Sequence, residues 1–258
     1  MSGNNLSISL HSPFVHPGKV KNNIEEHLKL IIGSEANINV FPELSLSGYH
    51  CGDIFFNKKY INECYEGIRK INEACLLNKT LAVFGCPLEI NNSLYNCAVI
   101  CGLENNIVAR AKVELAVSQE YYEQRWFKSG IYLNDNSSFI NKNLKIKVKS
   151  TLSNIDINFD SYAVRFAIDI CEDAWAEISP SMLIDSPDLI LNLSASSDTI
   201  SSRQARRFMM KGISERKKCP YLYVSGSTGE STSISLLNNI HLVYSGNNDL
   251  ERYFSSNK

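Results

Sequence analysis

Three apolar segments of this chain have the pattern of short buried β-strands, and each is followed by a side chain that can do chemistry. They are residues 38–41 before Glu43, residues 107–111 before Lys112, and residues 164–170 before Cys171. The end of a strand lies at the rim of a sheet, where α/β enzymes hold many of their reactive groups. The pattern therefore favours an α/β fold that presents these three side chains at the rim of a sheet.

The rest of the sequence alternates between helical and strand-like segments. Helices are expected over residues 19–32, 58–78 and 203–218. Further strands are expected at residues 6–10, 81–85, 95–100, 146–151, 189–193, 221–224 and 233–242, with another near Tyr244, and residues 95–100 should form a hairpin with residues 107–112. No linker rich in Pro, Gly or Ser and no repeat interrupts this order. We therefore expect a single domain over residues 1–258, with helices packed outside the sheets.

Composition excludes several classes of partner. The hydrophobic fraction is 44%, the charged fraction is 21%, and the net charge is −1, so nothing draws the chain to nucleic acid or to an anionic membrane surface. No apolar run approaches the roughly 20 residues that span a bilayer, and the first residues lack the pattern of a secretory signal. We expect a soluble cytoplasmic protein with a small-molecule substrate.

The eight cysteines do not form a metal-binding or disulfide pattern. No C-x-x-C pair and no histidine pair at zinc-finger spacing occurs, so neither a metal nor another cofactor is predicted. In a cytosolic protein these thiols should stay reduced, and most should be packing residues. Only Cys171 has a setting that suggests reactivity, because two acids follow it at the end of a strand-like segment.

Glu43, Lys112 and Cys171 together could catalyse acyl transfer. A free thiol with a pKa of about 8.5 is mostly protonated at neutral pH, so it needs a base, and a partly buried carboxylate can serve. A lysine ammonium near the attacked carbon can hold the oxyanion of a tetrahedral intermediate. Taken singly, Glu43 could cap a helix, Lys112 could be a solvated surface residue and Cys171 could be part of the core.

Three motifs resemble those of the nitrilase superfamily, the carbon–nitrogen hydrolases. Residues 41–49 (Phe-Pro-Glu-Leu-Ser-Leu-Ser-Gly-Tyr) resemble its glutamate motif, Lys112 its lysine, and residues 170–173 (Ile-Cys-Glu-Asp) its nucleophile motif. Within the superfamily, the chain is most similar to the glutaminase domain of glutamine-dependent NAD synthetases. The segments that carry this similarity are residues 48–49, 52–55, 171–175, 192–196 and 229–233.

The resemblance implies a four-layer α-β-β-α sandwich in which the chain pairs with a second copy. It also implies an amidase that uses a Cys-Glu-Lys triad and a thioester, with Cys171 as nucleophile, Glu43 as base and Lys112 at the oxyanion. Further residues are implied to support the site or hold the polar end of the substrate. Glu123 and Glu172 are the supporting residues, and Tyr49, Ser196 and Arg203 the substrate-binding ones.

The chain also departs from that subgroup. The Ser-Gly-Gly-x-Asp-Ser loop of the ATP-using synthetase domain does not occur, so we expect that this chain does not make NAD alone. After Lys112 the subgroup usually has a Leu-Pro pair and a tyrosine, where this chain has Ala116 and Ser118. This change should enlarge the pocket. Glutamine is the first candidate substrate, but the identity of the amide stays open.

Several functions remain in competition. An ammonia-supplying partner of a separate ATP-dependent synthetase and a free-standing amidase are both compatible with these residues. A non-catalytic dimeric interaction or regulatory module that keeps the nitrilase fold is the alternative of another class. Nitrile hydrolysis uses the same three groups, but the glutaminase-like segments near Cys171 and Gly229 favour amides.

Overall fold

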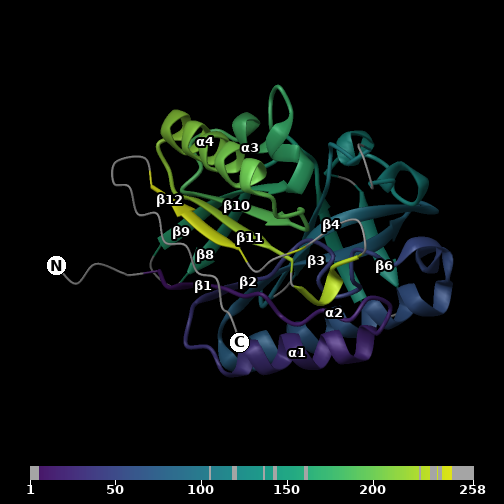
Figure 1. Cartoon of the computed structure of the whole chain (residues 1–258). Coiled ribbons are helices and arrows are strands. Elements are labelled where there is room, and N and C mark those ends of the chain that lie inside the picture. Colours follow the sequence, from purple (N-terminus) through teal and green to yellow (C-terminus); the bar gives the residue numbers. More distant parts are fainter. Residues whose placement is uncertain are drawn as a thin grey trace.

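Two β-sheets pack face to face, and helices cover the outer side of each sheet (Figure 1). The computed structural model describes residues 6–104, 106–117, 121–135, 137–141, 144–159, 162–226, 228–232, 237 and 240–245. The helices are α1 (Val20–Ile32), α2 (Lys58–Asn78), α3 (Pro180–Leu183) and α4 (Ile200–Lys217). The predicted single-domain α-β-β-α sandwich is thereby confirmed.

The first sheet has seven strands within the described residues. In spatial order they are β1 (Ile8–Leu10), β2 (Ile38–Val40), β3 (Leu81–Ile90), β4 (Ser93–Cys101), β5 (Ile107–Ala111), β7 (Leu144–Lys149) and β6 (Ser138–Asn141). The strands β1, β2 and β3 run parallel, and β3, β4 and β5 form an antiparallel meander. This sheet carries α1 and α2 (Figure 1).

The second sheet supplies the strand that leads to Cys171. Its described strands, in spatial order, are β12 (His241–Tyr244), β11 (Tyr221–Ser225), β10 (Leu189–Ser194), β9 (Tyr162–Ile170) and β8 (Ile155–Phe159). The strands β9, β10 and β11 run parallel, so their carboxyl ends share one edge. The sheet carries α3 and α4 on its outer face (Figure 1).

The core between the sheets is built from the apolar side chains that alternate along the strands. Val40 and Val83 from one sheet belong to the same buried cluster as Ile168 and Leu191 from the other. Burying an apolar side chain of this size contributes about 1.5–3 kcal/mol to the free energy of folding. The contact between the two inner faces therefore stabilises the packing of the sheets. The strand ends that carry Glu43, Lys112 and Cys171 are fixed to this core.

Strand boundaries differ from the prediction in several places. The strand expected to stop at Gly85 continues to Ile90, because β4 pairs with it along its whole length despite the strand-breaking residues Gly85 and Pro87. No strand was predicted over residues 155–159, but they form β8, in which Ile155 and Ile157 are buried while Asp156 and Asn158 are exposed. The helix expected from residue 203 begins at Ile200.

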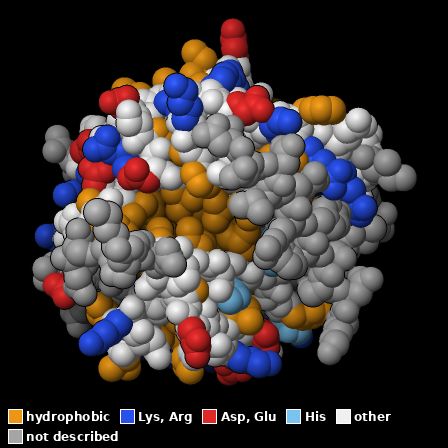
Figure 2. Space-filling model, turned by 90° about the vertical axis from the view of Figure 1, so that its left-hand side faces the viewer, with side chains coloured by type: hydrophobic (Ala, Val, Ile, Leu, Met, Phe, Trp, Pro, Cys, Tyr) orange, Lys and Arg blue, Asp and Glu red, His pale blue; other side chains and the backbone are white. Residues whose placement is uncertain are grey.

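The end of the chain is only partly described. Residues 233–236 and 238–239 of the strand predicted over 233–242 lie outside the described residues, and β12 pairs antiparallel with β11 from His241 onward. On the side where β12, β9 and β1 lie, Figure 2 shows a hollow with apolar side chains at its centre and charged ones toward its rim. Within the described residues, every helix is too short or too polar to cross a membrane.

Candidate active site

The loop that carries Glu43 is shaped by a close approach to β3. Phe41 continues the pairing of β2 by donating its N–H to the Val83 oxygen (2.8 Å). The chain then turns sharply at Leu44, whose φ is +48°. A Cβ on Gly85 would lie 1.9 Å from the Leu44 nitrogen, so glycine is required where β3 passes under this turn. The turn directs Glu43 away from solvent, with an exposed fraction of 0%.

The buried carboxylate of Glu43 has two polar partners on Oε1. The Lys112 ammonium donates to it at 2.6 Å, and the side-chain amide of Asn96 at 2.8 Å. Asn96 is on β4 and reaches this point because the antiparallel register sets it opposite Pro87. Burial raises the pKa of Glu43 to about 7, against the opposing effect of Lys112, and the Glu123 carboxylate adds to the rise.

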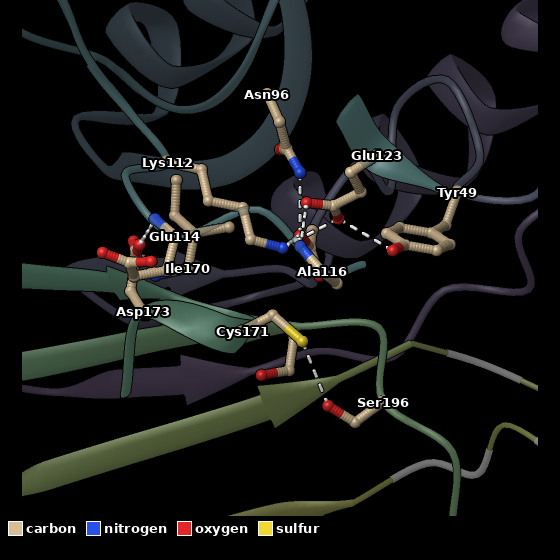
Figure 3. A network of polar contacts seen from close by, with 12 residues as sticks. Tyr49, Asn96, Lys112, Glu114, Ala116, Glu123, Ile170, Cys171, Asp173 and Ser196 are labelled. Carbon is tan, nitrogen blue, oxygen red and sulfur yellow. Dashed lines mark hydrogen bonds and ion pairs between the residues drawn. The ribbon is translucent and has the colours of Figure 1, made fainter. Parts of the chain in front are cut away.

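Lys112 directly follows β5 and is fully buried. Its backbone N–H donates to the Asn96 oxygen (2.8 Å), and its own oxygen accepts from Gly130 (2.7 Å). The ammonium lies between two carboxylates, 2.6 Å from Glu43 and 2.8 Å from Glu123 (Figure 3). Burial by itself lowers the pKa of Lys112, but the carboxylates of Glu123 and Glu43 outweigh it and raise this pKa well above its usual value.

Glu123 begins a short 3-10 helix, η2 (Glu123–Arg125), with its side chain turned inward. Its Oε1 accepts from Lys112 and from the Tyr49 hydroxyl (2.7 Å), and its Oε2 accepts from the Ala116 N–H (3.0 Å). Tyr49, expected at the substrate, thus has its hydroxyl directed at Glu123 (Figure 3). Glu123 therefore orders both the lysine and the loop that follows it.

Cys171 lies at the turn between β9 and a 3-10 helix, η4 (Cys171–Trp175). Its φ of +50° is a left-handed conformation that is costly for a residue with a side chain, and such strain is concentrated at functional sites. The sulfur lies 3.2 Å from the Ser196 hydroxyl. Burial and the nearby Glu43 carboxylate raise the pKa of the thiol to about 12, while Lys112 opposes the rise.

Asp173 is a site residue that the sequence analysis did not single out. Its Oδ1 accepts from the backbone N–H groups of Val113 (2.9 Å) and Glu114 (2.7 Å), and its Oδ2 accepts from Ile170 (2.9 Å). One buried carboxyl thus joins the loop after Lys112 to the strand before Cys171 (Figure 3). Burial, with the neighbouring Asp169, raises its pKa to about 8. The signals in the sequence were its place two residues after the cysteine and its position in the motif of residues 170–173.

The remaining predicted residues occupy varied positions. Glu172 is half-buried beside Cys171, and burial raises its pKa. Arg203 lies on α4, where its Nε donates to Asp198 at 2.7 Å and its Nη2 forms a second contact with the same carboxylate. Ser118 lies outside the described residues. Glu230, in a segment noted for its resemblance, is buried and accepts a hydrogen bond from the Tyr49 N–H.

The fold and the site define the class of protein. The family model for the carbon–nitrogen hydrolase matches residues 16–205, and the chain belongs to this family. Among curated relatives, the glutamine-dependent NAD(+) synthetase of Mycobacterium leprae is 27% identical over 204 residues (76% of this chain), and that of Arabidopsis thaliana is 23% identical over 208 residues (78% of this chain). The aligned part is 28% of each relative, so this chain matches only a fraction of their length.

Solved structures share the fold. A glutamine-dependent NAD(+) synthetase from Cytophaga hutchinsonii matches 93% of this chain and 39% of its own, with a TM-score of 0.72 and 23% identity. A mutant of the Nesterenkonia AN1 amidase, from the nitrilase superfamily, matches 100% of this chain and 89% of its own, with a TM-score of 0.73 and 10% identity. Because the carbon–nitrogen hydrolase model matches residues 16–205, the predicted membership of this superfamily is confirmed.

Proposed function

We propose that this chain is an amide hydrolase that releases ammonia from glutamine or a related small carboxamide through a thioester on Cys171. The observation that carries the proposal is the fully buried Glu43–Lys112–Glu123 array beside a thiol at a strained turn. Hydrolysis of a carbon–nitrogen bond is the activity for which the family is named. The names of the relatives favour glutamine as the first substrate to test.

In the first half of the proposed reaction, Glu43 takes the proton from Cys171 as the sulfur attacks the amide carbonyl carbon. The oxyanion that forms is held by the Lys112 ammonium and by the backbone N–H that follows Cys171. A thiol with a pKa near 12 does not ionise by itself at neutral pH, whereas a carboxyl with a pKa near 7 can both take and return a proton there. The pKa of Glu43 therefore suits a general base that acts at neutral pH.

In the second half, the proton on Glu43 passes to the leaving nitrogen, the carbon–nitrogen bond breaks, and ammonia leaves a thioester. Glu43 then takes a proton from water, whose oxygen attacks the thioester carbon, and that proton returns to the sulfur as the acid departs. Glu123 positions Lys112 throughout. Ser196 and Arg203 are the proposed contacts for the polar end of the substrate. Glu172 supports the site beside Cys171, and Tyr49, also expected at the substrate, has its hydroxyl bound to Glu123.

An ammonia-release screen tests this function. Glutamine, asparagine, simple primary amides and carbamoyl compounds are offered to the parent, to Cys171→Ala and to Glu43→Gln. At least one amide should be hydrolysed by the parent, with a loss of more than about 10³-fold in both variants. Turnover by Cys171→Ala equal to that of the parent would refute the assignment of Cys171 as the nucleophile. An electrophilic glutamine analogue should add one mass adduct at Cys171, and no adduct together with no turnover would favour the non-catalytic module.

Two finer proposals concern assembly. We propose a cytoplasmic homodimer or larger homo-oligomer, which light scattering in solution would detect, and a separate ATP-dependent synthetase that receives the ammonia. If that partner exists, mixing the two proteins should raise glutamine turnover. An unchanged rate on mixing would instead favour a free-standing amidase.

A further inference from the structure

A cavity of about 380 Å³ opens at the surface near the first turn of α2. Its walls come from a 3-10 helix, η1 (Gly52–Phe56), the start of α2, the turn between β3 and β4, and the segment that follows Glu123. Glu43, Lys112 and Cys171 are not among its lining residues. The volume falls in the range of sites that bind small molecules, about 300–1,000 Å³.

One part of the cavity wall is aromatic. Phe55, Phe56 and Trp126 line it, and the rings of Phe55 and Trp126 lie 6.0 Å apart between centroids. Phe56 keeps 58% of its surface exposed, so it does not serve the core. The rings of Phe56 and Trp126 offer aromatic surface to a flat ring, and the Arg125 guanidinium lies 5.9 Å from the centroid of the Phe56 ring.

The other part of the wall is cationic. Lys58, Arg125 and Lys128 line the cavity with Glu89 as the one acid among the lining residues. Arg125 is already neutralised by Asp53, which it contacts through Nε and Nη2 at 2.7 Å each. Neither Lys58 nor Lys128 forms a side-chain hydrogen bond or ion pair with any residue that the structure describes. The ammonium groups of Lys58 and Lys128 outnumber the single carboxylate of Glu89. The cavity therefore carries a net positive charge that attracts an anion.

We propose that this cavity is a second binding site, for a small anion that carries a planar ring. The ring lies against Phe56 and Trp126, and a phosphate or carboxylate lies between Lys58 and Lys128. Neither half of such a ligand uses the whole cavity, so a ring without charge or an anion without a ring should bind weakly. The proposed site is separate from the amidase centre, since Glu43, Lys112 and Cys171 do not line it.

Trp126 provides a direct reporter of binding. The only other tryptophan, Trp175, is on η4 in the other sheet's layer, so a Trp175→Phe variant leaves Trp126 as the sole source of indole fluorescence. The probes are adenosine 5′-monophosphate and benzoate as ring anions, adenosine as a neutral ring, and inorganic phosphate as a bare anion. We expect saturable quenching by at least one ring anion, at about 10-fold lower concentration than by adenosine or phosphate. The better of the two ring anions distinguishes phosphate from carboxylate.

Substitution of the lysines tests the placement of the charge. Lys58→Gln combined with Lys128→Gln should weaken binding of the ring anion by about 10-fold or more. The matched control is Lys145→Gln with Lys147→Gln, two exposed lysines of β7 outside the cavity, and it should bind like the parent. Tight binding of adenosine alone, equal binding by the Lys58 and Lys128 double variant, or no quenching by either ring anion would overturn the proposal.

The measurement is independent of catalysis. A Cys171→Ala variant should bind the ring anion as tightly as the parent, whether or not the parent hydrolyses any amide. Loss of binding in Cys171→Ala would show that the probe occupies the amidase centre instead, and that result would also overturn the second site. Because all the lysines changed here are exposed, the variants should fold, and circular dichroism checks this.

Discussion

The carboxylate of Asp173 accepts a hydrogen bond of 2.7 Å from the backbone N–H of Glu114, which lies 59 residues earlier in the chain. Its second oxygen binds the N–H of Ile170, the residue that precedes Cys171. The loop after Lys112 and the turn at Cys171 follow strands of different sheets, and among the described strands none pairs across the two sheets. The side chain of Asp173 therefore connects the loop after Lys112 to the end of the strand before Cys171.

An Asp173→Asn variant should therefore lose both stability and activity. Asparagine has one acceptor oxygen, and its amide group would face backbone N–H groups, so at least one buried donor is left without a partner at a cost of about 1–3 kcal/mol. Amide turnover should fall by at least about 10-fold, because Lys112 is displaced from Cys171. Urea unfolding and ammonia release measure the two effects. Asp156→Asn, which alters an exposed ion pair on β8, should change neither by much, and equal behaviour of the two variants would contradict this role.

The rate of amide hydrolysis should follow the ionisation of Glu43. With a pKa raised to about 7, the carboxyl is protonated at lower pH and cannot accept the thiol proton. The value of kcat/KM should rise by about 10-fold per pH unit up to pH near 7 and level off above it. A pH–rate profile between 5.5 and 8.5 measures this, with circular dichroism to confirm the fold at each pH. A profile that is flat across this range would contradict the assignment of Glu43 as base.

Gly85→Ala should disrupt the turn at Leu44 that positions Glu43. The new Cβ would lie within 2.7 Å of three backbone atoms of Glu43 and Leu44, so the loop must move, at a cost of about 3 kcal/mol or more. Gly212→Ala on α4 is the matched control, because a Cβ there meets no atom within 4 Å and alanine favours a helix by up to about 1 kcal/mol. Denaturant unfolding should move in opposite directions for the two variants. A Gly85→Ala protein as stable as the parent would show that this close approach is not needed.

Glu43, Lys112 and Cys171 could be predicted from local sequence. Each follows an apolar run that is recognisable as a strand even when the neighbouring strands of its sheet are not known. The contacts of Asn96 and Asp173 could not be predicted in this way. Asn96 reaches Glu43 only through the register of β3 with β4, and the sequence suggested that β3 stops at Gly85. The contact of Asp173 with Glu114 depends on how two sheets pack, which no periodicity encodes.

Two buried histidines should each contribute to stability in a pH-dependent way. His27 is fully buried between the Asn23 oxygen and the Ser45 hydroxyl, and burial lowers its pKa to about 4. Burial and the neighbouring His11 likewise lower the pKa of His241 to about 4. Each group stays neutral in the folded protein but gains a proton near pH 6.5 in the unfolded chain, so its contribution to stability is full above pH 6.5 and is lost as the pH falls toward 4. The raised pKa values of Glu43 and Asp173 contribute with the opposite sign.

The expected slope is about 1 kcal/mol per pH unit for each of these histidines between pH 6 and 4.5. Urea unfolding at a series of pH values measures it. In His27→Gln the slope should be smaller than in the parent, whatever the absolute stability of that variant. An equal slope in His27→Gln and in the parent would contradict the burial of a neutral His27.

The sharing of Lys112 between two carboxylates has a consequence for how a reaction cycle would end. Two carboxylates and one ammonium leave one negative charge at a buried site, and moving a proton from Cys171 to Glu43 relocates that charge without changing the total. An amide enters as a neutral carbonyl group and adds nothing to it. The acid formed from it would bring a second negative charge into the same buried site, where repulsion is weakly screened. The site would thus admit an uncharged reactant and expel an ionised product.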